Sequence, residues 1–351
     1  MTPPRRARAR KKPANKLPSK PPWKSARLAP LVLALIACLV AGAAAWAYFG
    51  AGPPAPQGRS TDLVLAPGSH LPSIAHALRR AGVVRAPLVF MVAAELTGAA
   101  GRLKAGEYRF ASGASVDTVL SMIRKGEVVR HFVTIPEGLT SRAAAAVLDN
   151  AAELTGTAPI PAEGALLPET YEVRWGEPRV RVLRRMMDAR DKLLANLWRT
   201  RRPGLPYRSP GDAVTLASIV EKETAKVEER PHIAAVFLNR LANGVRLESD
   251  PTVVYGLSGG APLGHGLRVS ELQTLTPYNT YLVAGLPPTP IANPGRAALA
   301  AALNPTHSAD LYFVADGTGG HVFSDTFATH LKNVARWRAI EQARAAGGTT
   351  P

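Results

Sequence analysis

The sequence predicts an α+β protein with a single transmembrane helix near its N-terminus, a small α+β module and a larger mixed α+β domain. Three observations lead to this prediction: an uncharged run at residues 28–50, an apolar content of 46% over 351 residues, and short strand-like segments that alternate with helix-like ones. This apolar content is sufficient for packed cores and excludes general disorder, and the length is typical of two or three domains.

The positive charge is concentrated at the N-terminus. Residues 1–27 contain ten Lys and Arg residues and no acid, so this tail supplies +10 of the net charge of +17. A basic tail can bind nucleic acid. The uncharged run that follows gives the basic residues a topological explanation instead, so nucleic acid is not an expected partner.

Residues 28–50 are predicted to form the transmembrane helix, because about 20 apolar residues span a bilayer. The basic tail on one flank and Trp46, Tyr48 and Phe49 on the other place the N-terminus in the cytoplasm and the bulk of the chain outside it. A cleaved signal peptide is the alternative, because residues 41–43 offer an A-x-A site. The length of the apolar run and of the tail favours a retained anchor.

Cysteine and histidine usage indicates that the chain uses neither thiol nor metal chemistry. Cys38 is the only cysteine and lies inside the predicted span, and the eight histidines show no H-E-x-x-H spacing. No disulfide framework and no cysteine-based metal site or nucleophile is expected outside the membrane, and a metallohydrolase is not predicted.

A Pro- and Gly-rich linker at residues 51–60 is predicted to separate the span from the small module at residues 61–130. Apolar spacing and turn residues predict its elements: a strand at 63–65, helices at 71–78 and 87–96, a strand around 108–110 and a helix at 116–123. Tyr108 is either a residue that stacks on a sugar or a half-buried strand tyrosine.

Residues 131–345 are predicted to form the larger domain, and residues 346–351 a frayed tail. Its expected elements are a strand at 132–135, a helix around 144–148, helices at 180–201, 210–223 and 231–242, a turn and helix from 250, a hairpin at 312–323 and a helix at 327–340.

The most informative stretch is the helix that ends at two glutamates. Ser209 is a predicted N-cap, followed by a proline at the first helical position, and the residues up to 220 form a broad apolar face. At about 100° per residue, Glu221 and Glu223 fall on opposite edges of this face.

Either glutamate is a candidate general acid. A carboxyl group with apolar neighbours has a raised pKa and can hold a proton for a glycosidic oxygen, and the bulkier neighbours favour Glu223 over Glu221. The alternative is that both are solvated charges at a helix end, with Lys222 and Lys226 as partners.

Several motifs of the larger domain occur in a fixed order: VTIPEGLT at 133–140, ASIVEKET at 217–224, ERPHIAAVFLNRL at 229–241, SDPTVVYGL at 249–257, and the blocks at 276–295 and 310–326. Together they resemble the YceG-like, endolytic murein transglycosylase family. The resemblance implies that the second glutamate of EKET, Glu223, is the catalytic residue. The element order of the small module resembles the LysM-like portion of the same family.

Five further residues are predicted to contact substrate. Short helices joined by tight turns can bring Asp250 and Tyr255 to the same cleft as Glu223, although Asp250 also fits a helix cap. Tyr278 and Asn279 offer aromatic and amide groups suited to N-acetyl sugars, although such residues often only pack loops. Glu169 is a second acid, in a segment (163–173) that lacks the family's aromatic residues beside the proline.

The resemblance implies a metal-free and cofactor-free lyase, and the predicted span places its catalytic domain outside the cytoplasm, at the inner membrane. Glu223 would protonate the oxygen between N-acetylmuramic acid and N-acetylglucosamine within a peptidoglycan strand. The 6-hydroxyl of the muramic acid would then attack, leaving a 1,6-anhydro end. Membrane peptidoglycan synthases are the expected partners. A muramidase-type hydrolase and a non-catalytic, membrane-tethered peptidoglycan-binding scaffold are the alternatives.

Overall fold

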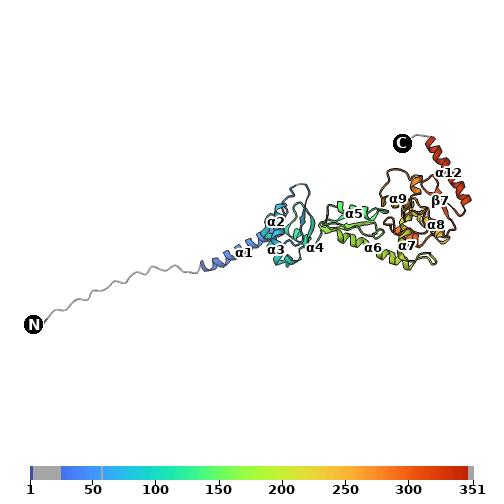
Figure 1. The fold of residues 1–351 in the computed structure, drawn as a ribbon. Helices are drawn as coiled ribbons and strands as arrows, with labels where there is room; N and C mark the ends of the chain where they lie inside the picture. The colour runs from blue at the N-terminus through green and yellow to red at the C-terminus, as the bar shows by residue number, and fades with distance from the viewer. Residues whose placement is uncertain (3–24, 57, 347–351) are drawn as a thin grey trace. The chain divides into compact units, whose positions relative to one another are not determined.

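The computed structural model describes residues 1–2, 25–56 and 58–346. The chain divides into two compact units, Met1–Glu127 and Val128–Pro351 (Figure 1). Helices and short two-stranded sheets make up both units, which confirms the α+β prediction. Most of the predicted basic tail and the residues of the predicted C-terminal tail from 347 on lie outside the described residues.

The first unit contains one long helix followed by a small α+β module. Its elements are α1 (Ser25–Phe49), β1 (Ser60–Leu65), α2 (Leu71–Arg80), α3 (Pro87–Leu96), the 3-10 helix η1 (Ala100–Arg102), β2 (Gly106–Ala111) and α4 (Val116–Lys125). The strands pair antiparallel, with Ser60 opposite Ala111. Among the described residues, Pro30–Phe49 of α1 is the one stretch long and apolar enough to cross a membrane, and none of it is buried.

Tyr108 belongs to the core of this module. Its side chain is fully buried and its hydroxyl donates to the carbonyl oxygen of Lys104 at 2.8 Å, while its ring stacks on Phe110. The possibility that Tyr108 stacks on a sugar is therefore wrong, because strand β2 turns this position inward.

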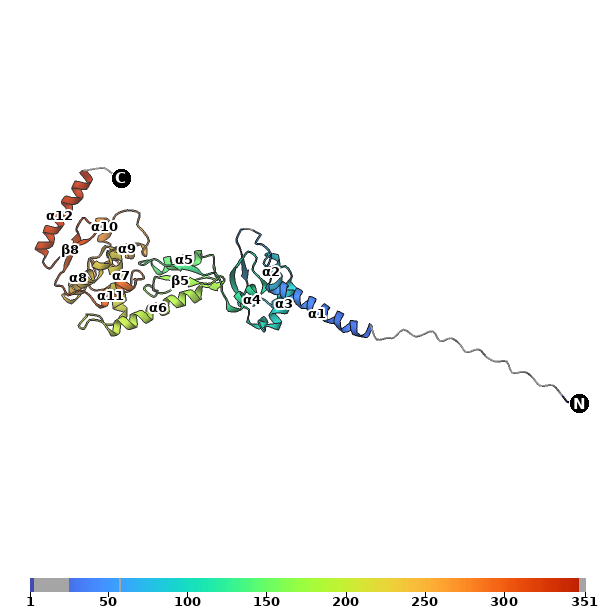
Figure 2. The same ribbon diagram turned by 180° about the vertical axis from the view of Figure 1, so that it is seen from behind.

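The second unit carries the motif segments. Its elements are β3 (His131–Thr134), α5 (Ser141–Asn150), β4 (Leu154–Thr155), β5 (Thr170–Val173), β6 (Glu177–Pro178), α6 (Arg179–Arg199), α7 (Pro210–Glu223), η2 (Val227–Glu229), α8 (Arg230–Ala242), α9 (Asp250–Ser258), α10 (Val269–Leu272), α11 (Arg296–Leu303), β7 (Tyr312–Ala315), β8 (His321–Ser324) and α12 (Phe327–Ala346). The β7–β8 hairpin packs against α12 (Figure 2).

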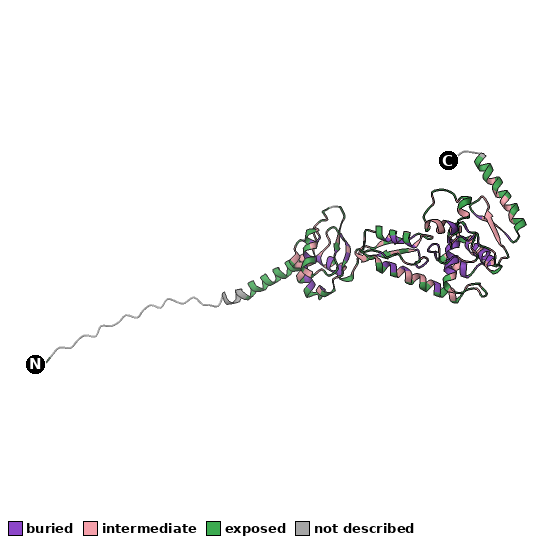
Figure 3. Ribbon diagram, in the orientation of Figure 1, coloured by how far each residue is buried: buried purple, intermediate pink, exposed green. Residues whose placement is uncertain are grey.

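Helix α7 is the centre of this unit. Every residue from Ala213 to Glu221 is buried, in a part of the ribbon that is mostly coloured as buried (Figure 3). The helix packs against both α8 and α11. The core that these helices share includes Leu216, Ile219, Val220, Ile233, Phe237, Leu299 and Leu303. Burial of such apolar surface is the main stabilising contribution to the unit and fixes the position at which α7 ends.

Candidate active site

Helix α7 delivers Glu223 to the edge of the core. The helix begins at the predicted N-cap, Ser209, with a capping box in which the Ser209 hydroxyl accepts from the amide of Asp212 and the Asp212 carboxylate accepts from the amide of Ser209. It ends at Glu223 because Thr224 adopts an extended backbone (φ −141°, ψ 136°). Glu223 is therefore the last residue of a buried helix, and its side chain is half-buried.

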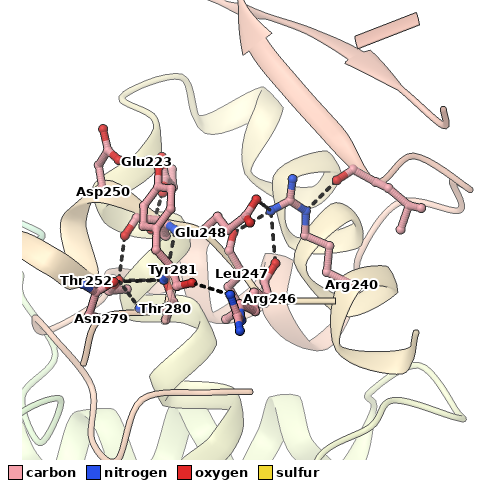
Figure 4. Close-up of polar contacts among 12 residues, drawn as sticks. Glu223, Arg240, Arg246, Leu247, Glu248, Asp250, Thr252, Asn279, Thr280 and Tyr281 are labelled. Atoms are coloured by element: carbon pink, nitrogen blue, oxygen red, sulfur yellow. Dashed lines mark hydrogen bonds and ion pairs between the residues drawn. The ribbon is translucent and has the colours of Figure 1, made fainter. Parts of the chain in front are cut away.

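Among the residues that the structure describes, no cation is bonded to the Glu223 carboxyl group. Its Oε1 accepts a hydrogen bond from the hydroxyl of Ser249, which is itself buried. Burial raises the pKa of Glu223 to about 7; the Ser249 hydrogen bond and Arg240 lower it, and the nearby Asp250 carboxylate raises it (Figure 4). Such a carboxyl group exchanges its proton near neutral pH.

A tight turn places Ser249 and Asp250 in front of Glu223. Glu248 has a left-handed backbone with φ of +50°, which is uncommon for a residue other than glycine. The turn is held by Arg240, whose buried guanidinium donates from Nη1 to the carbonyl of Leu247 at 2.8 Å (Figure 4). Because this turn fixes Ser249, it also fixes the orientation of the Glu223 carboxyl group.

Asp250 is the first residue of α9, and Ser249 occupies the N-cap position. The suggestion that Asp250 is only a helix cap is therefore wrong. The Tyr281 hydroxyl donates to Asp250 Oδ1 at 2.7 Å, and the Asp250 carboxylate is exposed beside Glu223 (Figure 4). Burial, followed by the hydrogen bond to Asp250, raises the pKa of Tyr281, so Tyr281 acts as a neutral donor to that carboxylate.

Asp250 and Tyr255 line a cleft of about 370 Å³ together with Lys222, the neighbour of Glu223. The Tyr255 hydroxyl donates to Glu163 Oε2 at 3.2 Å, and its ring lies 4.8 Å from the ring of Tyr278. The cleft therefore combines a carboxylate, an ammonium group and an aromatic wall, a combination that suits a polar sugar chain.

Glu163 is a site residue that the sequence reasoning missed. Its Oε1 accepts from the backbone amide of Ser141 at 2.7 Å, so it joins the start of α5 to Tyr255. Burial raises the pKa of Glu163, and these hydrogen bonds lower it by a smaller amount. The available signal was its place at the head of residues 163–173, a segment whose acids also include Glu169.

Glu221 lies in a different environment from Glu223. Arg230 Nη2 donates to Glu221 Oε1 at 2.8 Å, and the backbone amide of Gly295 donates to Oε2 at 2.9 Å. Arg230 also pairs with Glu137 at 3.2 Å. Both oxygens of Glu221 are thus occupied in a buried ion pair that joins several motif segments, and the reading of Glu221 as a solvated charge is wrong.

Two of the predicted substrate-binding residues, Asn279 and Glu169, make polar contacts within the protein instead. Asn279 is fully buried; its Nδ2 donates to the carbonyls of Leu272 and Thr274, and its Oδ1 accepts from the amide of Tyr281. Its side chain stabilises the loop, which argues against a substrate contact. The Glu169 carboxylate is paired with Arg296 at the start of α11.

A family model and individual proteins of known sequence match most of this chain. The sequence model of the YceG-like family matches residues 63–336. Proteins named endolytic murein transglycosylase from Streptococcus pneumoniae and Bacillus subtilis are each 30% identical, over 317 and 299 residues respectively. These alignments cover 76% of this chain, 56% of the Streptococcus pneumoniae protein and 81% of the Bacillus subtilis protein, so the chain spans little more than half the length of the former.

A solved structure agrees with these matches. The crystal structure of a YceG-like protein from Listeria monocytogenes is 28% identical, with a TM-score of 0.50, and the match covers 79% of this chain and 99% of that one. The region matched by the family model, residues 63–336, includes the end of α7, the Ser249 turn and the β7–β8 hairpin. This chain therefore belongs to the YceG-like family.

Proposed function

We propose that this chain is a membrane-anchored endolytic lytic transglycosylase of peptidoglycan, with Glu223 as its general acid and base. The observation that carries the proposal is the half-buried Glu223 carboxyl group, whose pKa is raised to about 7 at the end of a buried helix. Family membership supports it, because relatives from two bacteria are named endolytic murein transglycosylases.

In the proposed reaction, Glu223 gives its proton to the oxygen between N-acetylmuramic acid and N-acetylglucosamine as the bond from that oxygen to the anomeric carbon breaks. The 6-hydroxyl oxygen of the muramic acid then bonds to the anomeric carbon, and its proton returns to Glu223. The product carries a 1,6-anhydro end, and no water is consumed. Ser249 orients the carboxyl group, and the Asp250 carboxylate faces the positive charge that develops on the sugar.

The anchor and the module complete the proposal. Pro30–Phe49 would span the inner membrane once, with the N-terminus in the cytoplasm, residues 61–130 as a LysM-like module and residues 131–345 as an extracytoplasmic catalytic domain. Of the predicted substrate residues, Asp250 and Tyr255 line a cleft that is also lined by Lys222, the neighbour of Glu223, and the ring of Tyr278 lies 4.8 Å from that of Tyr255. This topology would keep the enzyme near nascent strands and membrane synthases, and the reaction would need no metal or cofactor.

A muramidase-type hydrolase is the second candidate. The specific observation in its favour is Asp250, which places a second carboxylate beside Glu223, as most glycosidases require. The two candidates differ in whether water is added at each cut.

Digestion of purified glycan strands by the full chain in detergent, followed by mass spectrometry, tests both candidates. Glu223→Gln should lower cleavage by about 10²- to 10⁴-fold, since loss of general acid–base catalysis has effects of this size. The matched control is Glu228→Gln, an exposed glutamate on η2, which should cleave like the wild type.

Three results would change the assignment. Products that gain water would identify a hydrolase. Unchanged cleavage by Glu223→Gln would remove Glu223 from the reaction. Strand binding without cleavage by the wild type would favour the scaffold.

A further inference from the structure

Helix α3 of the small module exposes an unusual apolar stripe. Leu88, Val92 and Leu96 follow one another at spacings of four residues, and their exposed fractions are 66%, 48% and 83%. The opposite face of the helix is buried through residues such as Phe90. A surface helix normally presents polar residues on its outer face, whereas this outer face of α3 carries three apolar side chains.

The stripe borders a groove whose second wall is the end of α1. The groove has a volume of about 420 Å³, and its α1 wall consists of Ala44, Ala45, Ala47 and Tyr48. These residues belong to the apolar stretch Pro30–Phe49 and lie within about 8 Å of its end, at about 1.5 Å per residue.

Specific contacts hold the module against this end of α1. The Tyr48 hydroxyl donates to Asp117 Oδ1 on α4 at 2.8 Å, and the Arg85 guanidinium lies 5.8 Å from the centre of the Trp46 ring. Helix α1 also packs against both α3 and α4. The depth of α3 is therefore tied to the depth of α1.

The depth of α1 follows from its length. Twenty apolar residues match the hydrocarbon thickness of about 30 Å, and aromatic residues such as Trp46 and Phe49 favour the interface at one end. Residues 44–48 then lie at the outer boundary between acyl chains and headgroups. The α3 stripe, which shares their groove, lies at the same level.

We infer that Leu88, Val92 and Leu96 insert into the outer leaflet, so that α3 is a second, interfacial membrane contact beside the span. Lipid is the occupant because the stripe continues the lipid-facing surface of α1. Residues 51–127 also contain nine Lys and Arg against five Asp and Glu, a net charge of +4 that suits anionic headgroups. The inference rests on the proposed membrane anchor and is independent of the Glu223 chemistry.

Quenching by brominated lipids tests this inference in the full chain, reconstituted in nanodiscs whose lipids carry bromine in the upper acyl chain. An environment-sensitive fluorophore is attached to Val92→Cys in a Cys38→Ala background. The matched control is Val64→Cys in the same background, an exposed valine on β1 of the same module. Label on the native Cys38, with deeper bromines, reports whether α1 itself is in lipid. Circular dichroism checks that each variant is folded.

We expect the Val92 probe to be quenched several-fold more strongly than the Val64 probe, with the Cys38 probe also quenched. Quenching at Cys38 but no excess at Val92 would overturn the inference and leave the anchor in place. Absence of quenching at Cys38 would overturn both. A Val92 probe that is shielded from water but not quenched would mean that protein covers the stripe, which also overturns it. The quenching experiment does not measure glycan cleavage, so its outcome is independent of whether the chain is an active enzyme.

Discussion

Glu221 and Glu223 lie two residues apart at the end of α7 but have different bonding partners. Glu221 has a guanidinium on one oxygen and a backbone amide on the other. Among the described residues, the Ser249 hydroxyl is the one hydrogen-bond partner of the Glu223 carboxyl group, on Oε1, and the Asp250 carboxylate lies nearby. Burial raises the pKa of both carboxyl groups, so burial alone does not mark a general acid. The two glutamates differ in their partners: Arg230 and the Gly295 amide occupy both oxygens of Glu221, whereas the Ser249 hydroxyl is the partner described for Glu223.

The largest expected effect is on stability and concerns the ion pair between Arg230 and Glu221. Arg230→Met leaves the buried Glu221 carboxylate without its cation, so the free energy of unfolding should fall by about 3–5 kcal/mol. Denaturant unfolding of the full chain in detergent measures it. Arg142→Met is the matched control, an exposed arginine on α5, and should change stability by less than about 0.5 kcal/mol. Equal effects of the two substitutions would mean that the ion pair does not hold the motif segments together.

Local signals in the sequence were sufficient to predict helix α7. The N-cap Ser209 and the proline that follows it act on their own helix terminus, so the start of α7 could be predicted from adjacent residues, and the structure places the N-cap at Ser209. The helical period likewise placed Glu221 and Glu223 on different edges of the apolar face, and the structure gives them different partners.

Contacts between distant segments could not be predicted in the same way. Ser249 meets Glu223 across 26 residues and Glu163 meets Tyr255 across 92, and no local pattern encodes such pairs. The sequence alone does not show whether the Asn279 amide contacts a sugar or, as in the structure, carbonyl groups of its own loop. Helix α11 was missed because its alanine-rich sequence is buried on several sides and shows no polar face.

An intermediate effect is expected from the proton on Glu223. Glu223→Gln should raise the free energy of unfolding at about pH 8 by on the order of 1–3 kcal/mol, because it removes the ionisation of a half-buried group whose pKa is raised from 4.5 to about 7. Below about pH 4.5 the carboxyl group is protonated in both the folded and the unfolded state, so wild type and variant should be equally affected by pH there. Between these pKa values only the unfolded state ionises, so the stability of the wild type falls as the pH rises.

Denaturant unfolding at about pH 5 and about pH 8 measures this difference. Glu228→Gln provides the control, because Glu228 is exposed and its substitution should have the same small effect at both pH values. A Glu223→Gln effect that does not depend on pH would argue that the Glu223 pKa is not raised.

The smallest expected effect concerns the two groups that tune Glu223. Ser249→Ala removes a hydrogen bond that lowers the Glu223 pKa, whereas Asp250→Asn removes a like charge that raises it. Because the general acid must be protonated, kcat/KM on glycan strands should fall above about pH 7 in the wild type. This falling limb should move to higher pH in Ser249→Ala and to lower pH in Asp250→Asn, by about one pH unit or less, since a hydrogen bond of about 1 kcal/mol corresponds to less than one pKa unit. Limbs that move in the same direction would mean that a group other than Glu223 supplies the proton.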